Sequence, residues 1–414
     1  MPRVAVIGGE LYAVRHAKDL GIDVVQVHVP GKYDERVAHY CEQVLEVGAL
    51  ADSEAVVEAL RPLHRARPFD RVVTTSEFGG VTAARVAEEF SLPGNSVRTA
   101  EILKDKALMR RVLDEHGLSP VAHRLVRSAE DIVGFLPSVD GRMVVKPVDG
   151  TASAHVQLVR GEEEAAAAWK AMRDAGYTEA LAEEFLEGPV GSVESFSAGG
   201  RHLPVTVTEY VVNDRFVEIG TTMPSRITDG VTRQLFDLTT ALLDAVGLVE
   251  GPAHTEFVLT PRGPRILESH NRMAGGGMPE LVRRAHGLDF ARMFLSVPTG
   301  LEALPTAVPE HRGAAIRMFA PDPGVVTHVT GLDEVDATVV RTPPGVVVPG
   351  TPGIVELADA EVGVMLQLNP GDVVPPLDAG WNRRAGYVIA SGRDCHEATA
   401  RCEDVFGKIG IHTS

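Results

Sequence analysis

Apolar and polar positions follow two different periods along the first hundred residues. Short unbroken apolar runs are typical of strands buried on both faces, and here they alternate with stretches whose apolar side chains recur at helical spacing. The runs predict strands at residues 4–8, 24–29 and 71–76, and the stretches predict helices at 10–20, 56–63 and 80–90. This β-α-β-α order predicts a doubly wound parallel sheet.

The pattern changes near residue 101, where helices and strands no longer alternate regularly. The segment ILKDKALMRRVLDEHG predicts one helix over residues 102–117, with Gly117 as its C-terminal stop. Strands are predicted near 142–147, 155–159, 179–184, 192–199, 202–213, 215–223, 252–259 and 265–270, and helices at 161–174 and 231–246. This arrangement predicts an α+β core.

Proline and glycine then gather in VPTGLEALPTAVPEHRG, which marks a boundary. The last hundred residues predict short strands between Pro/Gly turns, and a closing helix near 395–407. Three domains follow: an N-terminal α/β domain at 1–100, a core domain at 101–303, and a β-rich α+β domain at 304–414. A length of 414 residues agrees with about 150 residues per domain.

Composition and charge exclude several classes of function. The formal net charge of −17 repels polyanions, and no Lys/Arg cluster offsets it, so a nucleic-acid partner is not expected. No apolar run approaches the ~20 residues that a membrane-spanning helix needs, and the N-terminus lacks the features of a signal peptide. Cys41, Cys395 and Cys402 form neither a metal-like pair nor a disulfide framework, which favours a reducing cytoplasm.

The most informative chemistry lies in HTEFVLTPRGPRILESHNRMAGGG, residues 254–277, which predicts two strands joined by a Pro/Gly turn. We assume that Val258 pairs with Ile266 across this hairpin. Because side chains alternate with period two, one face then carries two opposed pairs. The pairs are Glu256 with Glu268, and His254 with His270.

Two carboxylates with Cβ atoms about 5 Å apart repel each other, so something positive must offset the repulsion. A divalent cation such as Mg²⁺ is one candidate, because it favours carboxylate oxygens together with nucleotide phosphates. The alternative is a solvated edge hairpin whose acids pair with Arg262 or Arg265.

Two lysines form a second candidate feature. Lys106 lies in the predicted helix, and Lys146 ends a strand before the small-residue loop VDGTASAH. A lysine at such a strand end can contact a phosphate, while backbone N–H groups of the loop cover the other oxygens. The alternative is a lysine that extends from a strand end into solvent. The segment ALAEEFLEGPVGSVES, residues 180–195, is by itself an ordinary β connection.

Taken together and in this order, the motifs resemble the ATP-grasp superfamily, specifically its carboxylate–amine (L-amino acid, dipeptide) ligase branch. The resemblance rests on VVKPVDGTASAHV, EEFLEGP, TEF, ILESHNR and the C-terminal AGYVIASGRDCHEATARCEDVF. It implies the ATP-grasp fold: the N-terminal sheet domain, a split ATP-binding core with a small lid at about 118–185, and the β-rich C-terminal domain.

The resemblance also implies roles for matching residues. Lys106 and Lys146 would contact ATP phosphates, and Arg272 would stabilise the transferred phosphoryl group. The phosphate loop would include Gly150, Thr151 and Ser153, and the adenine pocket Glu183, Glu184, Phe185 and Leu186. Glu256 and Glu268 would bind magnesium. Val190 stands where the family has a ribose-binding acid, so Glu187 or Glu194 would serve instead.

Other positions depart from the family or have open alternatives. His270 stands where the family often has a metal-binding Asn; it would reach the metal, bind substrate, or leave Asn271 to substitute. Arg226 would hold a substrate carboxylate, or lie at the surface. Gly275 and Gly276 would allow a substrate close to the backbone. Glu77 ends a strand of the first sheet, where it would bind substrate or cap a helix.

The activity implied by the resemblance joins a carboxylate to an amine, with amino acids as the expected substrates. ATP with Mg²⁺ or Mn²⁺ would convert the carboxylate to an acyl phosphate, and the amine would displace phosphate. A cytoplasmic homodimer is expected. Two alternatives stay open: an ATP-grasp carboxylase that uses bicarbonate, and a non-catalytic nucleotide-binding protein. A dehydrogenase is disfavoured because VIGGELYAVRH lacks G-x-G-x-x-G spacing.

Overall fold

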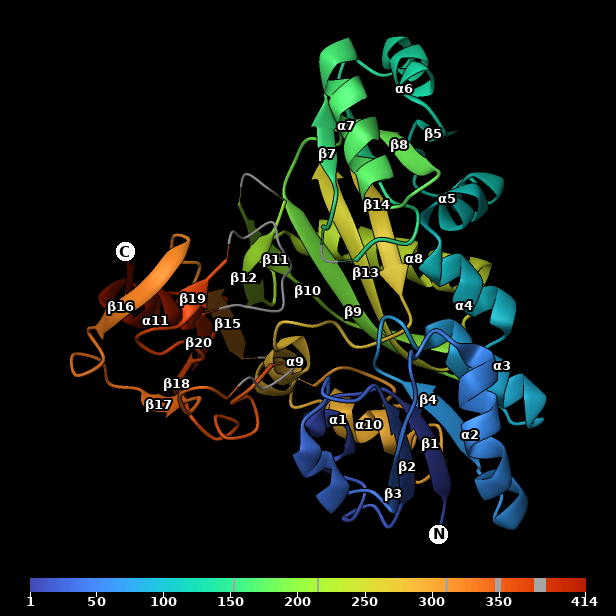
Figure 1. The fold of residues 1–414 in the computed structure, drawn as a ribbon, viewed down its shortest axis with the longest axis vertical. Helices are drawn as coiled ribbons and strands as arrows, with labels where there is room; N and C mark the ends of the chain where they lie inside the picture. The colour runs from blue at the N-terminus through green and yellow to red at the C-terminus, as the bar shows by residue number, and fades with distance from the viewer. Residues whose placement is uncertain (152, 214–215, 310–311, 347–350, 376–384) are drawn as a thin grey trace.

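The computed structural model describes residues 1–414 except 152, 214–215, 310–311, 347–350 and 376–384 (Figure 1). The N-terminal part is a parallel sheet in the order β3-β2-β1-β4, which confirms the predicted doubly wound sheet. Its strands are β1 (Arg3–Ile7), β2 (Asp23–His28), β3 (Gln43–Glu46) and β4 (Arg71–Thr74). Its helices are α1 (Leu11–Val14), α2 (Ser53–Ala66) and α3 (Gly80–Glu89).

The strand order of this sheet reverses at β1, because β2 and β3 lie on one side of β1 and β4 on the other. Open α/β sheets bind ligands at such a switch point, outside the carboxyl ends of the strands. The segment that follows β4, including Glu77, lies at this end of the sheet. Two details differ from prediction: the helix expected at 10–20 is α-helical only over Leu11–Val14, and the polar edge strand β3 was missed.

The core domain contains an antiparallel sheet in the order β10-β9-β13-β14. Its strands are β9 (Val190–Ala198), β10 (Arg201–Val207), β13 (Gly251–Thr260) and β14 (Gly263–His270), and the helices beside it are α4 (Val97–Lys104), α5 (Lys106–Glu115) and α8 (Asp229–Ala245). The single helix predicted at 102–117 is wrong. It breaks at Asp105, whose extended backbone and side chain cap α5 by accepting hydrogen bonds from the N–H groups of Ala107 and Leu108.

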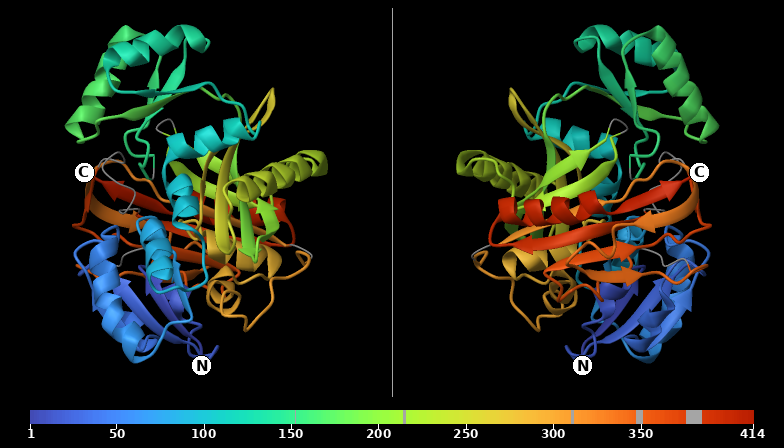
Figure 2. Two further views of the ribbon diagram at one scale, coloured as in Figure 1. Left: turned by 90° about the vertical axis from the view of Figure 1, so that its right-hand side faces the viewer. Right: turned by 90° about the vertical axis from the view of Figure 1, so that its left-hand side faces the viewer.

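A second antiparallel sheet, in the order β5-β8-β6-β7, forms a separate layer above the core (Figure 2). It contains β5 (His123–Val126), β6 (Met143–Lys146), β7 (Gln157–Val159) and β8 (Ala180–Glu184), with α6 (Ala129–Phe135) and α7 (Glu162–Asp174). These elements enclose their own buried apolar cluster. This part of the chain includes most of the predicted lid. It meets the core at the end of β8, where Glu183 pairs with Arg110 and Glu184 with Arg262.

The C-terminal region contributes to a six-stranded sheet in the order β11-β12-β15-β20-β18-β17. Because β12 pairs with β15, this sheet joins strands from both sides of residue 304. The remaining elements are β11 (Glu209–Val212), β12 (Glu218–Met223), α9 (Met278–His286), α10 (Phe290–Ser296), β15 (Gly313–Met318), β16 (Gly324–Thr330), β17 (Thr338–Arg341), β18 (Val362–Leu366), β19 (Val373–Val374), β20 (Gly386–Gly392), α11 (Cys395–Lys408) and β21 (Gly410–Thr413).

Two predicted strands change in this region. The strand expected at 202–213 is divided at Thr208 into β10 and β11, which belong to different sheets. The strand expected at 215–223 begins at a residue outside the described part of the chain, and β12 occupies its remainder. Helices α9 and α10 were not predicted.

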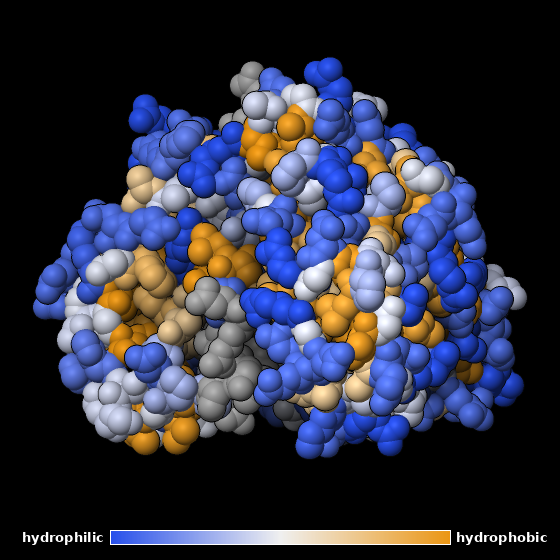
Figure 3. Space-filling view, turned by 90° about the horizontal axis from the view of Figure 1, so that it is seen from above, coloured by the Kyte–Doolittle hydropathy of each residue, from blue (hydrophilic) through white to orange (hydrophobic). Residues whose placement is uncertain are grey.

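Polar side chains cover much of the face seen from above, and apolar side chains lie among them in scattered groups (Figure 3). Within the described residues, every helix is too short or too polar to cross a bilayer.

Candidate active site

The β13–β14 hairpin places the two predicted acids opposite each other. Glu256 pairs with Glu268, and His254 pairs with His270, as the sequence predicts. The assumed pairing of Val258 with Ile266 is wrong, because Val258 pairs with Arg265. The two-residue turn would by itself place Glu256 opposite Leu267. A β-bulge at Leu267 shifts the register by one residue and brings Glu268 into place.

Basic groups hold the Glu268 carboxylate. Lys106 Nζ lies 2.7 Å from Oε2, and His270 Nε2 lies 3.2 Å from Oε1. Burial alone would raise the pKa of Glu268, but Lys106 and His270 hold it well below its usual range. The carboxylate is therefore ionised.

Glu77 joins the N-terminal domain to the same cluster. Its carboxylate contacts Lys104 Nζ at 3.3 Å and His270 Nδ1 at 3.3 Å, and Arg272 Nε donates a hydrogen bond to it. Burial opposes ionisation, yet His270, Arg272 and Lys104 lower the pKa of Glu77. Lys104 was missed by the sequence reasoning, although it lies two residues before Lys106 in the same LKDK segment.

His254 links Glu256 to a buried acid. Its Nδ1 lies 2.6 Å from Glu194 Oε1, and its Nε2 lies 3.2 Å from Glu256 Oε1. Burial alone would lower the pKa of His254, but Glu194 and Glu256 raise it to about 10, so the ring is charged. Glu194, predicted as a ribose contact, is instead buried and paired with His254.

Lys146 and Glu183 form a second buried ion pair. Glu183 accepts from Lys146 Nζ at 2.6 Å and from Arg110 Nε at 2.7 Å. Burial would raise the pKa of Glu183, but the two cations lower it to about 2. Arg110 was missed; its polar side chain on an amphipathic helix gave no signal that it would be fully buried.

The remaining predicted adenine residues follow Glu183 at the end of β8. Glu184 accepts from Arg262 at 2.5 Å and from the Ala122 N–H at 3.1 Å. The Arg142 guanidinium lies 5.0 Å from the centre of the Phe185 ring. Leu186 is half-buried beside it.

The predicted phosphate loop is tied to the α4–α5 junction. Lys106 donates through its backbone N–H to Val148 O (2.8 Å) and through Nζ to Gly150 O (2.7 Å). Lys104 Nζ donates to Asp149 O at 3.0 Å. Farther along, Ser153 Oγ donates to Phe216 O at 2.9 Å, while Thr151 lies half-buried between these two contacts.

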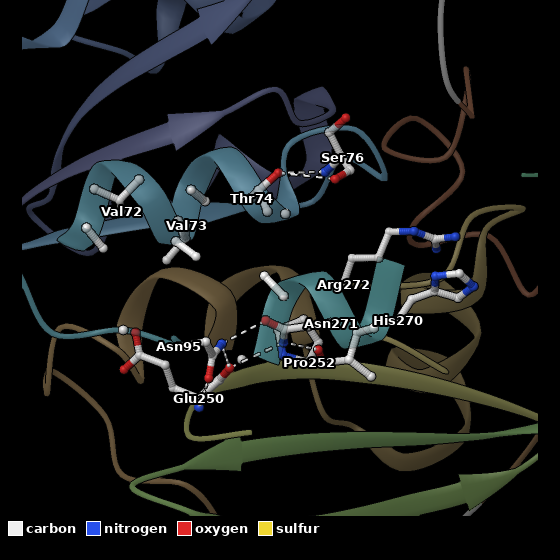
Figure 4. A pocket seen from close by; sticks show the side chains of 18 of the residues that line it. Val72, Val73, Thr74, Ser76, Asn95, Glu250, Pro252, His270, Asn271 and Arg272 are labelled. Atoms are coloured by element: carbon white, nitrogen blue, oxygen red, sulfur yellow. Dashed lines mark hydrogen bonds between the residues drawn. The ribbon is translucent and has the colours of Figure 1, made fainter. Parts of the chain in front are cut away.

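Several predicted residues lie away from the acid pair. Asn271 accepts at Oδ1 from Asn95 at 2.7 Å and donates to Pro252 O at 2.9 Å, so its amide faces a different part of the site (Figure 4). Arg226 is half exposed and binds Glu209 at 2.8 and 2.6 Å. Gly275 and Gly276 lead into α9, and Gly276 adopts a positive φ of 64°.

A pocket adjoins Arg272 and His270, between the N-terminal domain and the core (Figure 4). Small and apolar side chains form much of its wall, and they come from β4, α3 and α4. These include Val73, Ala83, Ala84, Ala87 and Leu103. Arg272 and His270 lie at one end and Glu250 at the other, so a charged group and an apolar group could both find partners here.

The acid pair fits a divalent cation that is shared with a nucleotide. Mg²⁺ is usually held by one or two carboxylates together with phosphate oxygens, and Glu256 and Glu268 supply such a pair. Among the described residues, no group of three or more His, Cys, Asp and Glu could hold a metal ion by itself.

The fold and the site define the class of protein. A lid sheet stands over an antiparallel core sheet, and acids and lysines gather at their junction, which is the architecture of an ATP-grasp protein. Family models agree: the ATP-grasp N-terminal domain matches residues 14–94, the ATP-grasp domain 139–280, and the L-amino acid ligase C-terminal domain 2 residues 351–414. The chain belongs to the ATP-grasp superfamily, in its carboxylate–amine (L-amino acid) ligase branch.

Curated relatives and solved structures agree with this family. The chain is 26% identical over 268 residues to the alanine–anticapsin ligase of Bacillus subtilis (strain 168), covering 59% of this chain and 57% of that protein. It is 22% identical over 274 residues to the L-arginine-specific L-amino acid ligase of Bacillus subtilis, covering 64% of this chain and 66% of that protein. The chain thus spans about three-fifths of the length of these relatives.

Two solved structures share the fold. The L-amino acid ligase from Bacillus licheniformis has a TM-score of 0.79 at 21% identity, covering 100% of this chain and 99% of that chain. The biotin carboxylase domain of the Hydrogenobacter thermophilus 2-oxoglutarate carboxylase has a TM-score of 0.73 at 16% identity, covering 99% and 90%.

Proposed function

We propose that the protein joins a carboxylate substrate to an amine substrate, at least one of them an amino acid, with ATP converted to ADP and phosphate through an acyl phosphate. The observation that carries the proposal is the opposed pair of Glu256 and Glu268, with Lys106 at 2.7 Å from Glu268. This pair lies beside Arg272, which shares the acid Glu77 with His270.

The chemistry requires the carboxylate to be activated, because oxide is too poor a leaving group for an amine to displace. Transfer of the γ-phosphoryl group depends on positioning and charge neutralisation rather than on covalent help from the protein. Lys106 and Lys146 would exchange their present partners, Glu268 and Glu183, for phosphate oxygens. Arg272 would stabilise charge on the transferred group. A bound Mg²⁺ held by Glu256 and Glu268 would neutralise the phosphates.

The lid supports this scheme, since an acyl phosphate must be shielded from water. Loop residues Gly150, Thr151 and Ser153 would cover the phosphates, and residues 183–186 would hold adenine at the junction of lid and core. For the ribose, the burial of Glu194 favours Glu187, which is exposed and pairs with Arg142 at 2.9 Å. The structurally similar biotin carboxylase domain of the Hydrogenobacter thermophilus enzyme was solved with MgADP, which agrees with ATP and Mg²⁺ as the proposed nucleotide and metal.

The pocket beside Arg272 would hold one of the substrates. Its carboxylate or acyl phosphate would face Arg272, and an apolar side chain would contact the small residues of α3. The ion pair between Arg226 and Glu209 leaves Arg226 a weaker candidate for this role than Arg272.

A product assay over a matrix of amino acids tests the proposal. We expect ADP and phosphate only when both an acid and an amine are supplied, and a new amide by mass spectrometry. AMP and pyrophosphate would indicate adenylation and contradict the proposal. ADP release that needs bicarbonate instead of an amine would favour the carboxylase alternative, and nucleotide binding without turnover for any pair would favour the non-catalytic one.

A further inference from the structure

Two histidines are arranged alike on the two strands of the β13–β14 hairpin. Each ring uses Nε2 to contact the acid two residues nearer the turn, at 3.2 Å in both cases: His254 contacts Glu256, and His270 contacts Glu268. Each ring uses Nδ1 to contact a further acid, which is Glu194 for His254 and Glu77 for His270. The rings are nearly parallel, with centroids 6.3 Å apart and an interplanar angle of 17°.

The two anchoring acids come from different places. Glu77 reaches His270 from the N-terminal domain, whereas Glu194 reaches His254 from β9, the strand next to β13 in the same sheet. Glu194 is 2% exposed and also accepts from Ser192 Oγ at 2.6 Å, and Ser192 in turn contacts Thr208 Oγ1 at 2.7 Å. On the opposite side of the ring, Nε2 also lies 3.4 Å from the hydroxyl of Tyr210 on β11. The Nδ1 side of the His254 ring is thus oriented by a buried network of Glu194, Ser192 and Thr208.

This network ends at a side chain that faces the site. The His254 side chain is 5% exposed, whereas that of Glu256 is 27% exposed. A fixed N–H group that contacts one carboxylate oxygen restricts the rotation of that carboxylate. Without such a restraint, Glu256 would rotate away from Glu268, because like charges that face each other across strands repel.

We infer that His254 is a positioning residue: anchored by Glu194, it holds Glu256 facing Glu268 in the geometry that receives a divalent cation with the nucleotide. The inference rests on the proposed function. Residues that orient metal-binding side chains typically change metal affinity or activity by about 10–100-fold when they are replaced. Because the His254 side chain is 5% exposed and contacts Glu256, this role is exerted through Glu256.

Two substitutions separate the two contacts of the ring. His254→Asn places an amide nitrogen near the position of Nδ1, so it keeps the contact with Glu194 and loses the contact with Glu256. His254→Gln places its amide nitrogen near the position of Nε2, so it keeps the contact with Glu256 and loses the one with Glu194. Mn²⁺ affinity is measured by electron paramagnetic resonance with a non-hydrolysable ATP analogue, alongside the apparent KM for Mg²⁺ and thermal unfolding.

For a positioning role, we expect His254→Asn to weaken Mn²⁺ affinity and to raise the KM for Mg²⁺ by about tenfold or more. Its melting temperature should fall, because buried Glu194 loses a charged partner, but by less than that of His254→Gln, because the hydrogen bond to Glu194 is kept. His254→Gln should keep metal affinity within about threefold while losing stability, because Glu194 is left buried with fewer partners. A folded His254→Asn protein with unchanged metal affinity would overturn the inference, as would a folded His254→Gln protein that loses it tenfold.

Loss of the fold in both variants would assign His254 a purely structural role and would also overturn the inference. Mn²⁺ binding by the wild-type protein distinguishes failure of this inference from failure of the proposed function. If wild-type protein binds no Mn²⁺ with the nucleotide analogue, the proposed function fails. If it binds Mn²⁺ but His254→Asn behaves identically, only the role of His254 fails.

Discussion

At the scale of single residues, the site is a set of carboxylates that each contact basic groups from other parts of the chain. Glu268 meets Lys106, Glu77 meets Arg272, and Glu183 meets both Lys146 and Arg110. Several of these ions are buried, where an unpaired charge is costly, so each pair is strongly coupled to its surroundings. Replacing one partner of a buried pair should therefore lower stability or activity more than the same replacement in an exposed ion pair.

Glu268→Gln keeps the shape of the side chain but removes the charge that faces Glu256. We expect ADP formation to slow by on the order of 100-fold, the typical cost of losing one preorganised charge-stabilising group. Steady-state kinetics at saturating Mg²⁺ measures the change. Glu163→Gln, at an exposed position of the lid helix α7, is the matched control and should behave as wild type. Equal rates in the two variants would remove Glu268 from the catalytic machinery.

Glu183→Gln tests the buried pair in the lid. It leaves Lys146 and Arg110 without a charged partner, so the free energy of unfolding at pH 7 should fall by roughly 3 kcal/mol. The folded pKa of Glu183, about 2, lies below its ordinary value of 4.5. The stabilisation is thus fully present above about pH 4.5 and disappears as the pH falls toward 2.

Urea unfolding of wild type and Glu183→Gln between pH 7 and pH 3 measures this dependence. The difference in unfolding free energy between the two proteins should be constant above about pH 5 and shrink below pH 4.5. A difference that does not change with pH would show that the ionised carboxylate is not the source of the stability.

At the scale of elements, two local irregularities position the site. The break at Asp105 turns one predicted helix into α4 and α5, and it places Lys104 and Lys106 against the carbonyls of residues 149 and 150. The bulge at Leu267 brings Glu268 opposite Glu256. Both features interrupt a regular element directly before a residue of the candidate site: Asp105 precedes Lys106, and Leu267 precedes Glu268.

Asp105→Ala removes the cap of α5 and should cost about 1 kcal/mol of unfolding free energy. Because Lys106 is the first residue of that helix, we also expect a higher KM for ATP. Asp52→Ala is the control, since Asp52 caps α2 in the N-terminal domain through the N–H of Ala55 at 3.1 Å. Similar stability losses with a raised KM only in Asp105→Ala would support the role of the break, and matching KM values would oppose it.

At the scale of the whole molecule, the site depends on the docking of the N-terminal domain onto the core. Glu77 follows β4 of the first sheet, and it binds His270 and Arg272 at the end of the core hairpin. The pocket beside them is walled by both domains. A substrate in this pocket would therefore contact both domains at once.

Ala84→Leu adds apolar volume to the wall of this pocket on α3. We expect the KM of one amino acid substrate to rise about tenfold or more, since a single methylene in a binding pocket can change binding by 1–3 kcal/mol. The KM for ATP should not change. Arg85→Leu, exposed on the same helix, is the control. A raised KM for ATP with no change for either substrate would place the substrate elsewhere.

The sequence predicted most of the regular elements and the identity of the acids, but few of the contacts between them. Glu256, Glu268, Lys106, Lys146 and Arg272 were recognisable from motifs at fixed spacing. The contacts of Lys104, of Arg110 and of His254 were not, because each residue belongs to a surface-like or strand-like pattern with no distinctive neighbours. Asn271 was considered as a metal ligand, yet its amide contacts Asn95, which lies between α3 and α4.

By itself, the sequence determined the type and order of the elements, because the periodicity of apolar side chains is a local property of strands and helices. It also determined that each strand of the hairpin carries an acid and a histidine two residues apart, and therefore on one face of that strand. Only the tertiary structure decided which cations meet those acids, because Glu77, Glu183 and Glu194 lie far along the chain from their partners. The bulge that aligns Glu256 with Glu268 likewise depends on how neighbouring strands pair, which no local pattern encodes.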